Sequence, residues 1–309
     1  MAEDLQVDLA HPVVWETKAF EHLVIDEETK DLIQALVTTK LKTDQGTDLI
    51  AGKGNGLIML LHGGPGTGKT FTAESVAEYA GKPLFRVTCG DIGTKPEDVE
   101  KYIESVLHLG KIWGCVVLLD EADVFLEQRT LTDLERNALV SVFLRVLEYY
   151  EGILILTSNR VGTFDEAFKS RIQLSLHYEN LDRSQRMKIW KNFLNRLKSL
   201  EEESNKVKAV LEPLPETSRK RKREEDNAQG IDYDDIDCYL AELADQEMNG
   251  RQIRNAITTA RQLAKFKNVK MSHTHLMHVI KVSSRFDKYL QKIQNNYTDD
   301  QVARGEGFR

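Results

Sequence analysis

Cysteine is scarce in this sequence, and long apolar runs are missing. The three cysteines, Cys89, Cys115 and Cys238, lie far apart and form no C-x-x-C pair, which excludes a zinc or redox site of that type. No stretch approaches the roughly eighteen consecutive apolar residues of a transmembrane helix, and the start, MAEDLQVDLAHPVVW, lacks the basic flank and apolar run of a signal peptide. We therefore expect an intracellular protein, cytoplasmic or nuclear, with no membrane insertion.

An excess of basic charge is also missing. The chain has 42 basic and 49 acidic residues, a net charge of -7, so general attraction to nucleic acid or anionic lipid is not indicated. The basic run RKRKR at Arg219–Arg223 is followed by EED, and it is either a weak import-like signal or a solvated charge run. Hydrophobic residues make up 41% of the 309 residues, which fits a soluble globular protein of two domains.

Five short apolar runs predict β-strands. They cover Leu57–Leu61, Leu84–Thr88, Cys115–Leu119, Ile153–Thr157 and Ile172–Leu176. The first, third and fourth are nearly uninterrupted, as is typical of strands covered on both faces. Because helical patterns lie between the runs, the sequence predicts an α/β fold, a three-layer domain with a mostly parallel five-stranded sheet.

The strand signal ends near Tyr178, and helical patterns follow it. They cover Asp182–Leu200, Asp234–Ala244 and Arg251–Phe266. A charged segment with two prolines and few apolar residues separates the first two and predicts an exposed, disordered insertion at about residues 201–230. The expected organisation is a lead-in segment at 1–55, an α/β domain at 56–180, a small all-helical domain at 181–295 and a flexible tail at 296–309.

Residues 62–70 read HGGPGTGKT and predict a phosphate-binding loop. They fit G-x-x-x-x-G-K-[ST] between a strand and a helix, the setting that the mechanism requires. Glycines let successive backbone N–H groups converge on an anion, while Lys69 would reach the β- and γ-phosphates and the Thr70 hydroxyl would hold Mg²⁺. A glycine-rich turn that merely joins strand to helix has no need of this Lys-Thr pair. The expected nucleotide-binding residues are Gly63, Gly64, Pro65, Gly66, Thr67, Gly68, Lys69, Thr70 and Phe71.

The apolar strand in CVVLLDEADVF ends in two acids. Asp120 would bind the magnesium shell, directly or through water, and Glu121 would polarise a water for in-line attack on the γ-phosphate. Two acids after a strand are commonly a solvated loop, but their combination with a phosphate loop favours these chemical roles. We therefore expect ATP and Mg²⁺ as cofactors, with Thr70 and Asp120 as metal-binding residues and Glu121 as the catalytic base. Asp123 is interpreted as structural.

These two motifs, followed by LILTSNR and FDEAFKSRI, resemble AAA+ ATPases in order and setting, in particular the AAA domain of a group of fungal ATPases. The resemblance covers roughly Val13–Ile280. It implies that Asn159 is the polar sensor that positions the attacking water, and that Arg171 projects into the neighbouring subunit's nucleotide. The other interpretations are a turn former for Asn159 and a surface salt bridge for Arg171. Arg160 and Arg136 are lesser candidates for the arginine that projects into the neighbouring subunit's nucleotide.

The resemblance extends into the helical domain. The segment MNGRQIRNAI is similar to the family's second sensor, with Arg251 at the position that would contact the γ-phosphate from the lid and Arg254 as the alternative. Leu23 and Val24 fall near the family's adenine pocket, although both could equally be core residues. The family's protein unfoldases carry an aromatic-apolar-glycine loop after the second strand, whereas this chain has CGDIGTKPEDVE, which argues against peptide threading.

The resemblance implies a Mg-dependent ATP hydrolase that forms a homo-oligomeric ring, a hexamer in this family, and remodels an unknown protein or other macromolecule. Two alternatives remain: a P-loop kinase of a small molecule, and an ATP-gated interaction module with little turnover. Glu121 and Asn159 favour water as the acceptor of the phosphoryl group. Three histidines, His273, His275 and His278, lie close in sequence, but the first two diverge by about 200° around a helix, so no shared metal is expected.

Overall fold

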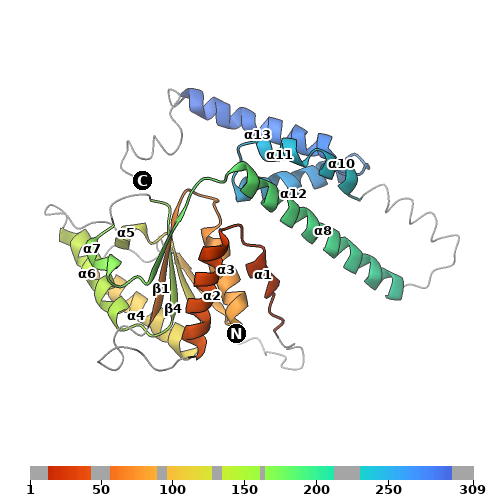
Figure 1. Cartoon of the computed structure of the whole chain (residues 1–309). Helices are drawn as coiled ribbons and strands as arrows, with labels where there is room; N and C mark the ends of the chain where they lie inside the picture. Colours follow the sequence, from red (N-terminus) through yellow and green to blue (C-terminus); the bar gives the residue numbers. More distant parts are fainter. Residues whose placement is uncertain are drawn as a thin grey trace, which may run out of the picture.

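The structure is a computed structural model that describes residues 13–42, 56–88, 96–126, 134–160, 164–211 and 230–293. Several expected features lie outside these residues: Cys89 with most of the loop after the second strand, the basic run Arg219–Arg223, and the tail from residue 296. The described chain forms an α/β domain followed by a helical domain that lies over one end of the sheet (Figure 1).

The α/β domain is built on a five-stranded sheet with the order β2-β3-β4-β1-β5, and each pairing among the described strands is parallel. The strands are β1 (Leu57–Gly63), β2 (Leu84–Thr88), β3 (Val116–Asp120), β4 (Ile153–Ser158) and β5 (Leu174–Tyr178). All residues of β3 and β4 are buried, as the uninterrupted apolar runs predict. The expected α/β fold with its five-stranded sheet is confirmed.

The fifth strand begins two residues later than the sequence indicated. Gln173, just before it, accepts a hydrogen bond from the Ile58 backbone N–H through its side-chain Oε1 at 2.6 Å, and its own N–H donates to the Ile58 carbonyl at 3.0 Å. Its side-chain Nε2 also donates to the Gly56 carbonyl at 2.9 Å. A side chain thus supplies bonds that a neighbouring strand would otherwise make, and the regular ladder starts at Leu174.

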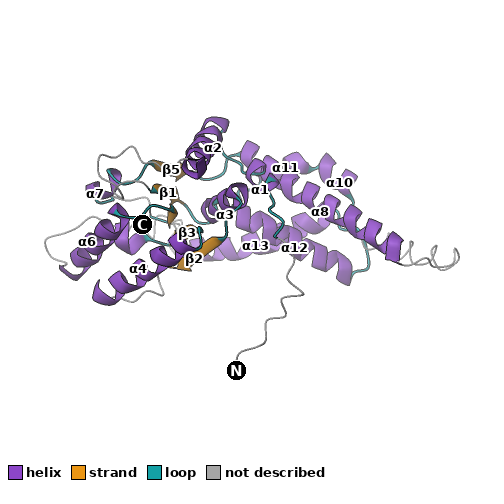
Figure 2. Ribbon diagram, turned by 90° about the horizontal axis from the view of Figure 1, so that it is seen from below, coloured by secondary structure: helices purple, strands orange, loops and turns teal. Residues whose placement is uncertain are grey.

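Helices cover both faces of the sheet and make three layers (Figures 1 and 2). One face carries α1 (Lys18–Glu21), α2 (Glu27–Lys42) and α3 (Lys69–Ala80), and the other carries α4 (Pro96–Ile112), α5 (Asp123–Leu126), α6 (Leu134–Glu148) and α7 (Glu166–Lys169). Successive side chains of a strand point to opposite faces. In β1, Met59 accordingly packs with Ile33 and Val37 of α2, whereas Leu60 packs with Phe168 of α7.

The helical domain contains α8 (Arg183–Leu211), α10 (Tyr233–Cys238), α11 (Leu240–Asp245), α12 (Gly250–Phe266) and α13 (His273–Ile293) around the fully buried Trp190. The segment expected at Asp234–Ala244 is two short helices, and α13 is a helix that the sequence patterns did not single out. The helix α8 runs through the first part of the expected insertion, and residues 212–229 lie outside the described chain. Within the described residues, no helix has both the length and the apolar character that crossing a bilayer requires.

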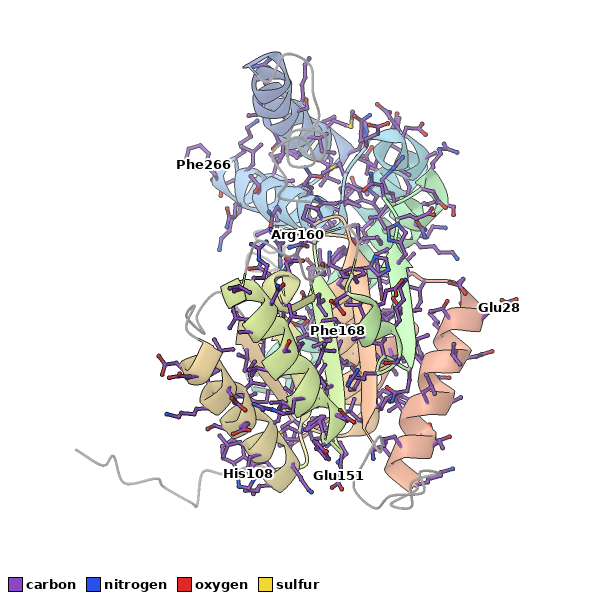
Figure 3. All side chains as sticks on the ribbon, turned by 90° about the vertical axis from the view of Figure 1, so that its left-hand side faces the viewer. Glu28, His108, Glu151, Arg160, Phe168 and Phe266 are labelled. Atoms are coloured by element: carbon purple, nitrogen blue, oxygen red, sulfur yellow. The ribbon has the colours of Figure 1, made fainter. Side chains whose placement is uncertain are left out.

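The two ends of the sheet face different surroundings. Arg160, just beyond the carboxyl end of β4, lies at the end of the α/β domain that faces the helical domain, whereas His108 and Glu151 lie at the opposite end (Figure 3). Because every strand is parallel, all five carboxyl ends meet at the edge that faces the helical domain, or lid. In sheets of this kind, ligands bind at that edge.

Candidate nucleotide site

The strand β1 ends in the glycine-rich loop, and α3 begins directly after it. Gly63, Gly66 and Gly68 have φ angles of 144°, 72° and 110°, a region of backbone space that favours glycine. At Gly63 an added Cβ would lie 2.1 Å from the carbonyl oxygen of Tyr178 on β5. The loop therefore needs glycine both for its curl and for its close approach to the neighbouring strand.

Lys69, the first residue of α3, is buried, with 6% of its surface exposed. Its Nζ donates hydrogen bonds to the carbonyl oxygens of Gly63 at 2.9 Å and Gly64 at 2.6 Å. Thr67 closes the same turn by donating from its hydroxyl to the Gly64 carbonyl at 2.8 Å. The structure thus places a buried cation at the start of a helix, where the helix dipole also favours an anion such as a phosphate.

Thr70 and Asp120 come together across the site. The Thr70 hydroxyl lies 3.5 Å from Asp120 Oδ1, and Thr157 of β4 donates from its hydroxyl to the same oxygen. Asp120 is 6% exposed, so its carboxylate is held in one place at the end of β3. A hydroxyl beside a carboxylate is the donor set that Mg²⁺ prefers, and these residues fit that ion.

Arg86 is a site residue that the sequence reasoning missed. It lies on β2, next to β3, and its Nη2 is 2.6 Å from Asp120 Oδ2. Desolvation raises the pKa of Glu74 on α3, while the guanidinium groups of Arg86 and Arg254 oppose that shift. The two arginines therefore lie within electrostatic reach of one glutamate. An arginine in an otherwise mostly apolar strand next to the one that ends in Asp120 was the available signal.

Glu121 and Asn159 lie at the same edge of the sheet. Glu121 is exposed and has a φ of 58°, uncommon for a residue with a side chain, and its N–H donates to the Thr157 hydroxyl at 3.0 Å. Asn159 follows β4, which pairs with β3, and it is partly exposed. Asp123 accepts hydrogen bonds from the Ser158 hydroxyl and, at 3.4 Å, from the Arg160 N–H, which are contacts of a structural kind.

Arg171 lies away from this edge. It precedes β5, whose first pair joins Leu174 to Met59 near the amino end of β1, whereas the phosphate loop follows the carboxyl end. Its Nη2 is 3.1 Å from Glu148 Oε2 at the end of α6, and its Nη1 donates to the Ala167 carbonyl at 2.9 Å. The structure therefore does not bring Arg171 to the phosphate loop of its own chain.

The lid touches the phosphate loop directly. Gly250, the first residue of α12, donates its N–H to the Gly66 carbonyl at 3.0 Å, and an added Cβ at Gly66 would lie 2.6 Å from the side chain of Asn249. Arg251 is exposed on the first turn of α12, whereas Arg254 is the lid arginine in electrostatic contact with Glu74.

The remaining expected residues are spread around these elements. Leu23 is 4% exposed and packs in the apolar cluster beneath α1 and α2, so it is a core residue here, while Val24 is partly exposed. Phe71 is 44% exposed on α3, and Pro65 is exposed in the loop. Arg136 lies on α6.

Two histidines flank the start of the loop. His62 Nδ1 lies 3.2 Å from His177 Nδ1 on β5, and the rings of His62 and Phe164 form a T-shaped pair with an interplanar angle of 75°. Burial, together with the charges of His177 and Lys69, lowers the pKa of His62. The imidazole therefore favours its neutral form beside the phosphate loop.

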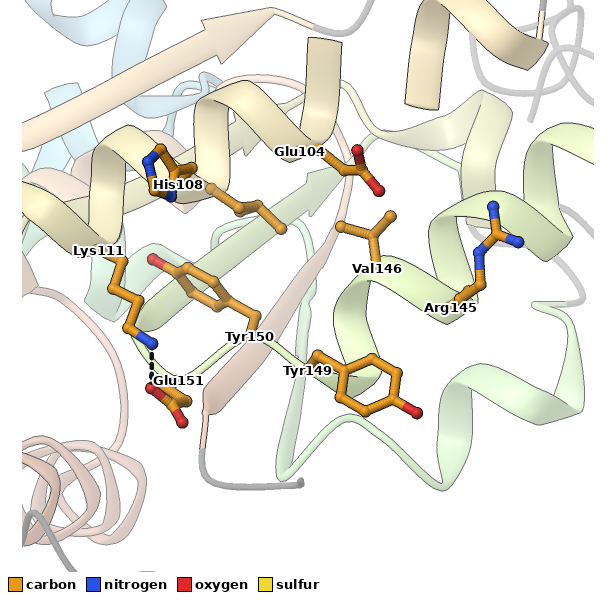
Figure 4. Close-up of a pocket in the computed structure, with 9 residues that line it drawn as sticks. Glu104, His108, Lys111, Arg145, Val146, Tyr149, Tyr150 and Glu151 are labelled. Atoms are coloured by element: carbon orange, nitrogen blue, oxygen red, sulfur yellow. Dashed lines mark ion pairs between the residues drawn. The ribbon is translucent and has the colours of Figure 1, made fainter. Parts of the chain in front are cut away.

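A separate cavity lies at the other end of the α/β domain, between α4 and α6 (Figure 4). It has a volume of about 360 Å³ and contains Tyr149, Tyr150 and an ion pair between Lys111 and Glu151. Its lining includes no residue of the phosphate loop and neither Asp120 nor Glu121. The nucleotide site and this cavity are thus distinct places on the molecule.

Residues 59–180 match the family described as ATPase family associated with various cellular activities (AAA), and residues 181–297 match the fungal AAA+ ATPase lid domain. The chain belongs to the AAA+ ATPases. The family boundary at residues 180 and 181 falls between β5 and α8, so the AAA family match and the helical lid correspond to the two parts of the fold. Membership in this family implies nucleotide binding.

Curated relatives of this AAA+ chain are distant. The ATPase family AAA domain-containing protein 3 of Bos taurus is 25% identical over 242 residues, which cover 76% of this chain and 38% of that protein. The ATPase family AAA domain-containing protein 3A homolog of Drosophila melanogaster is 30% identical over 155 residues, which cover 48% of this chain and 24% of that protein. A Lon protease of Leptospira interrogans is 32% identical over 113 residues. The chain spans less than half the length of each of these relatives.

Proposed function

We propose that this AAA+ chain binds ATP together with Mg²⁺ and hydrolyses it to ADP and orthophosphate. The observation that carries the proposal is the meeting of Thr70 and Asp120, whose oxygens lie 3.5 Å apart beside the buried Lys69. A phosphate loop alone needs no carboxylate at that place. A loop, a hydroxyl and a carboxylate at one edge of the sheet are the parts that phosphoryl transfer uses.

Each residue then has a role that follows from its position. Lys69 and the backbone N–H groups of the loop bind the β- and γ-phosphates, and Thr70 with Asp120 hold Mg²⁺, which would neutralise charge on the transferring group. Glu121 takes a proton from the attacking water, and Asn159 orients that water. Thr157 contacts both the Asp120 carboxylate and the Glu121 N–H, so one side chain sets the spacing of the metal-binding residue and the base.

Hydrolysis in this proposal depends on assembly. Arg171 lies away from the phosphate loop of its own chain, paired with Glu148, and an arginine supplied by a neighbouring subunit would stabilise the charge of the transition state. Homo-oligomeric rings, hexamers in this family, would bring the two together, and Arg251 or Arg254 would contact the nucleotide from the lid. The motion of the lid would then remodel an unknown protein or other macromolecule.

The proposal is tested by orthophosphate release. The parental protein with ATP and Mg²⁺ should release phosphate, and chelation of the metal should stop it. Glu121→Gln should bind ATP like the parent but lose about 10²- to 10⁴-fold in turnover, since it removes only the base. Glu28→Gln, an exposed change on α2, is the matched control and should keep the parental rate.

Two competing functions give different results in the same assay. A small-molecule kinase would yield ADP and a phosphorylated metabolite in place of orthophosphate. An interaction module would bind ATP with no phosphate release at any protein concentration, and Glu121→Gln would then leave the product pattern unchanged. Parental turnover in Glu121→Gln would remove this residue from the mechanism.

A further inference from the structure

The contact between Arg86 and Asp120 has no role in the proposed mechanism. The guanidinium nitrogen lies 2.6 Å from Asp120 Oδ2, and the two side chains differ in access to solvent: 52% of the Arg86 side chain is exposed, against 9% of the Asp120 side chain. The carboxylate is therefore held in place, whereas the arginine has room to move. A charged donor at this distance makes a strong hydrogen bond.

The two oxygens of Asp120 face different partners. Oδ1 accepts from Thr157 and lies 3.5 Å from the Thr70 hydroxyl, so it belongs to the side where the metal would bind. Oδ2 is engaged by Arg86. The guanidinium does not contact Oδ1, but its positive charge offsets part of the negative charge that would attract a divalent cation.

We propose that Arg86 is a positioning residue that acts as the counter-ion of Asp120 and opposes binding of Mg²⁺ until a nucleotide brings further negative charge. The inference rests on the proposed function, because it assumes that Asp120 serves the metal of ATP. Free Mg²⁺ must overcome the positive charge of Arg86. Mg²⁺ that arrives with ATP is accompanied by phosphates, which supply the missing charge.

Glu74 is a second carboxylate near Arg86. Arg86 and Glu74 interact electrostatically, and Glu74 lies on α3, the helix that begins with Lys69. Once Mg²⁺ engages Asp120, the guanidinium can turn toward Glu74 or toward the phosphates without losing an anionic partner. Glu74 also interacts electrostatically with Arg254 of the lid. If Arg86 moves toward Glu74 when the metal site is occupied, the interaction between Glu74 and Arg254 would change.

The test uses Mn²⁺ alone, with no nucleotide, as a spectroscopic substitute for Mg²⁺ in electron paramagnetic resonance titrations of the full chain. Arg86→Gln should bind Mn²⁺ about tenfold more tightly than the parent, the effect expected when a half-exposed unit charge near the ion is removed. Arg86→Lys keeps the charge and should stay close to the parent. The double variant R86Q/D120N should lose the gain, which assigns the ion to Asp120.

Arg145→Gln is a matched control, because Arg145 is also largely exposed and paired with a glutamate, Glu100, on the other side of the fold. It should leave Mn²⁺ affinity unchanged. Equal or weaker Mn²⁺ binding by Arg86→Gln would overturn the inference, and so would a gain that persists in R86Q/D120N. If Arg86→Gln does not fold without metal, Mg²⁺ alone should restore its circular dichroism, and failure to do so would also overturn it.

ATP binding by the parent, measured in parallel, reports the proposed function separately. A parent that binds no ATP contradicts the proposed function. A parent that binds ATP and an Arg86→Gln variant with unchanged Mn²⁺ affinity contradict the role of Arg86 alone.

Discussion

The N–H of Gly250 donates a hydrogen bond to the carbonyl of Gly66, 3.0 Å away, and this contact joins the lid to the phosphate loop. Gly250 opens α12, and the preceding Asn249 caps that helix by accepting from the Gln252 N–H at 2.9 Å. The start of a lid helix is thus attached to the loop that would hold phosphates. A displacement of the loop at Gly66 would therefore disturb the first turn of α12.

Gly66→Ala should separate the lid from the loop. An alanine at a φ of 72° costs about 1–3 kcal/mol of backbone strain, and its Cβ would lie 2.6 Å from the Asn249 side chain. We expect a lower free energy of unfolding in urea and weaker ATP binding. Gly230→Ala, whose added Cβ meets nothing within 4 Å, is the control and should have little effect. The penalty of Gly66→Ala should shrink in an Asn249→Ala background, and strict additivity of the two changes would contradict the proposed clash.

Lys69→Ala should weaken ATP binding without unfolding the protein. The change removes a charged donor from the loop, worth about 1.5–3 kcal/mol, or roughly 10- to 150-fold in the dissociation constant. Calorimetric titration with ATP measures it. Lys101→Ala, an exposed change on α4, is the control. Unchanged ATP affinity in Lys69→Ala would refute the role of this lysine.

The sheet could be predicted from the sequence because buried parallel strands are encoded by short apolar runs. Three of its five strands have apolar residues on both faces, which yields short uninterrupted runs. The start of β5 could not be predicted, because the side chain of Gln173 makes hydrogen bonds to the backbone of Gly56 and Ile58 in place of a regular strand pairing. No local sequence pattern indicates such side-chain bonds. The helix α2 buries only Ile33 and Val37, too few apolar positions to stand out from a polar segment.

The parts of the site that are contiguous in the chain could be predicted, and the contacts across elements could not. Lys69 and Thr70 share one motif, and Asp120 and Glu121 share another, so their spacing is written in the sequence. The pairing of Arg86 with Asp120 depends on the register between β2 and β3, and the contact of Gly66 with Gly250 depends on how the lid folds back. Such contacts follow from topology rather than from local spacing.

The free energy of unfolding should decrease as the pH is lowered through the range where His62 titrates. Burial first, and then the charges of His177 and Lys69, lower the pKa of His62 from its ordinary value of 6.5. The unfolded chain therefore binds a proton more readily than the folded one, so the stabilising difference is fully present above pH 6.5 and is lost as pH falls through the lower folded pKa. Urea unfolding at a series of pH values from about 8 to 5 measures this loss.

His62→Gln should flatten this pH dependence, because glutamine does not titrate. His275 also has a lowered pKa, caused mainly by burial, so a smaller slope should remain in the variant. His177→Gln should reduce the slope in part, since it removes one of the neighbouring charges. A His62→Gln protein with the parental slope would show that the loop histidine does not control stability in this range.

Arg171→Ala should lower ATP turnover in the nucleotide pocket of the neighbouring subunit. Arg171 lies near the amino ends of the strands and the phosphate loop at their carboxyl ends, so the role proposed for this arginine requires a pocket of another chain. An arginine supplied in this way accelerates hydrolysis by about 10³- to 10⁵-fold in related chemistry. Arg171→Ala alone and Lys69→Ala alone should both be nearly inactive. Mixing the two should restore phosphate release, because some pockets of the Arg171→Ala subunits then receive an arginine from a Lys69→Ala neighbour.

The structural partner of Arg171 provides the control. Glu148→Gln breaks the same ion pair, whose atoms lie 3.1 Å apart, but keeps the guanidinium, so it should cost stability without removing turnover. Activity that depends on protein concentration would accompany a site shared between chains. No recovery in any ratio of the two inactive variants, with both of them folded and assembled, would mean that Arg171 does not act across a subunit boundary and serves only its contact with Glu148.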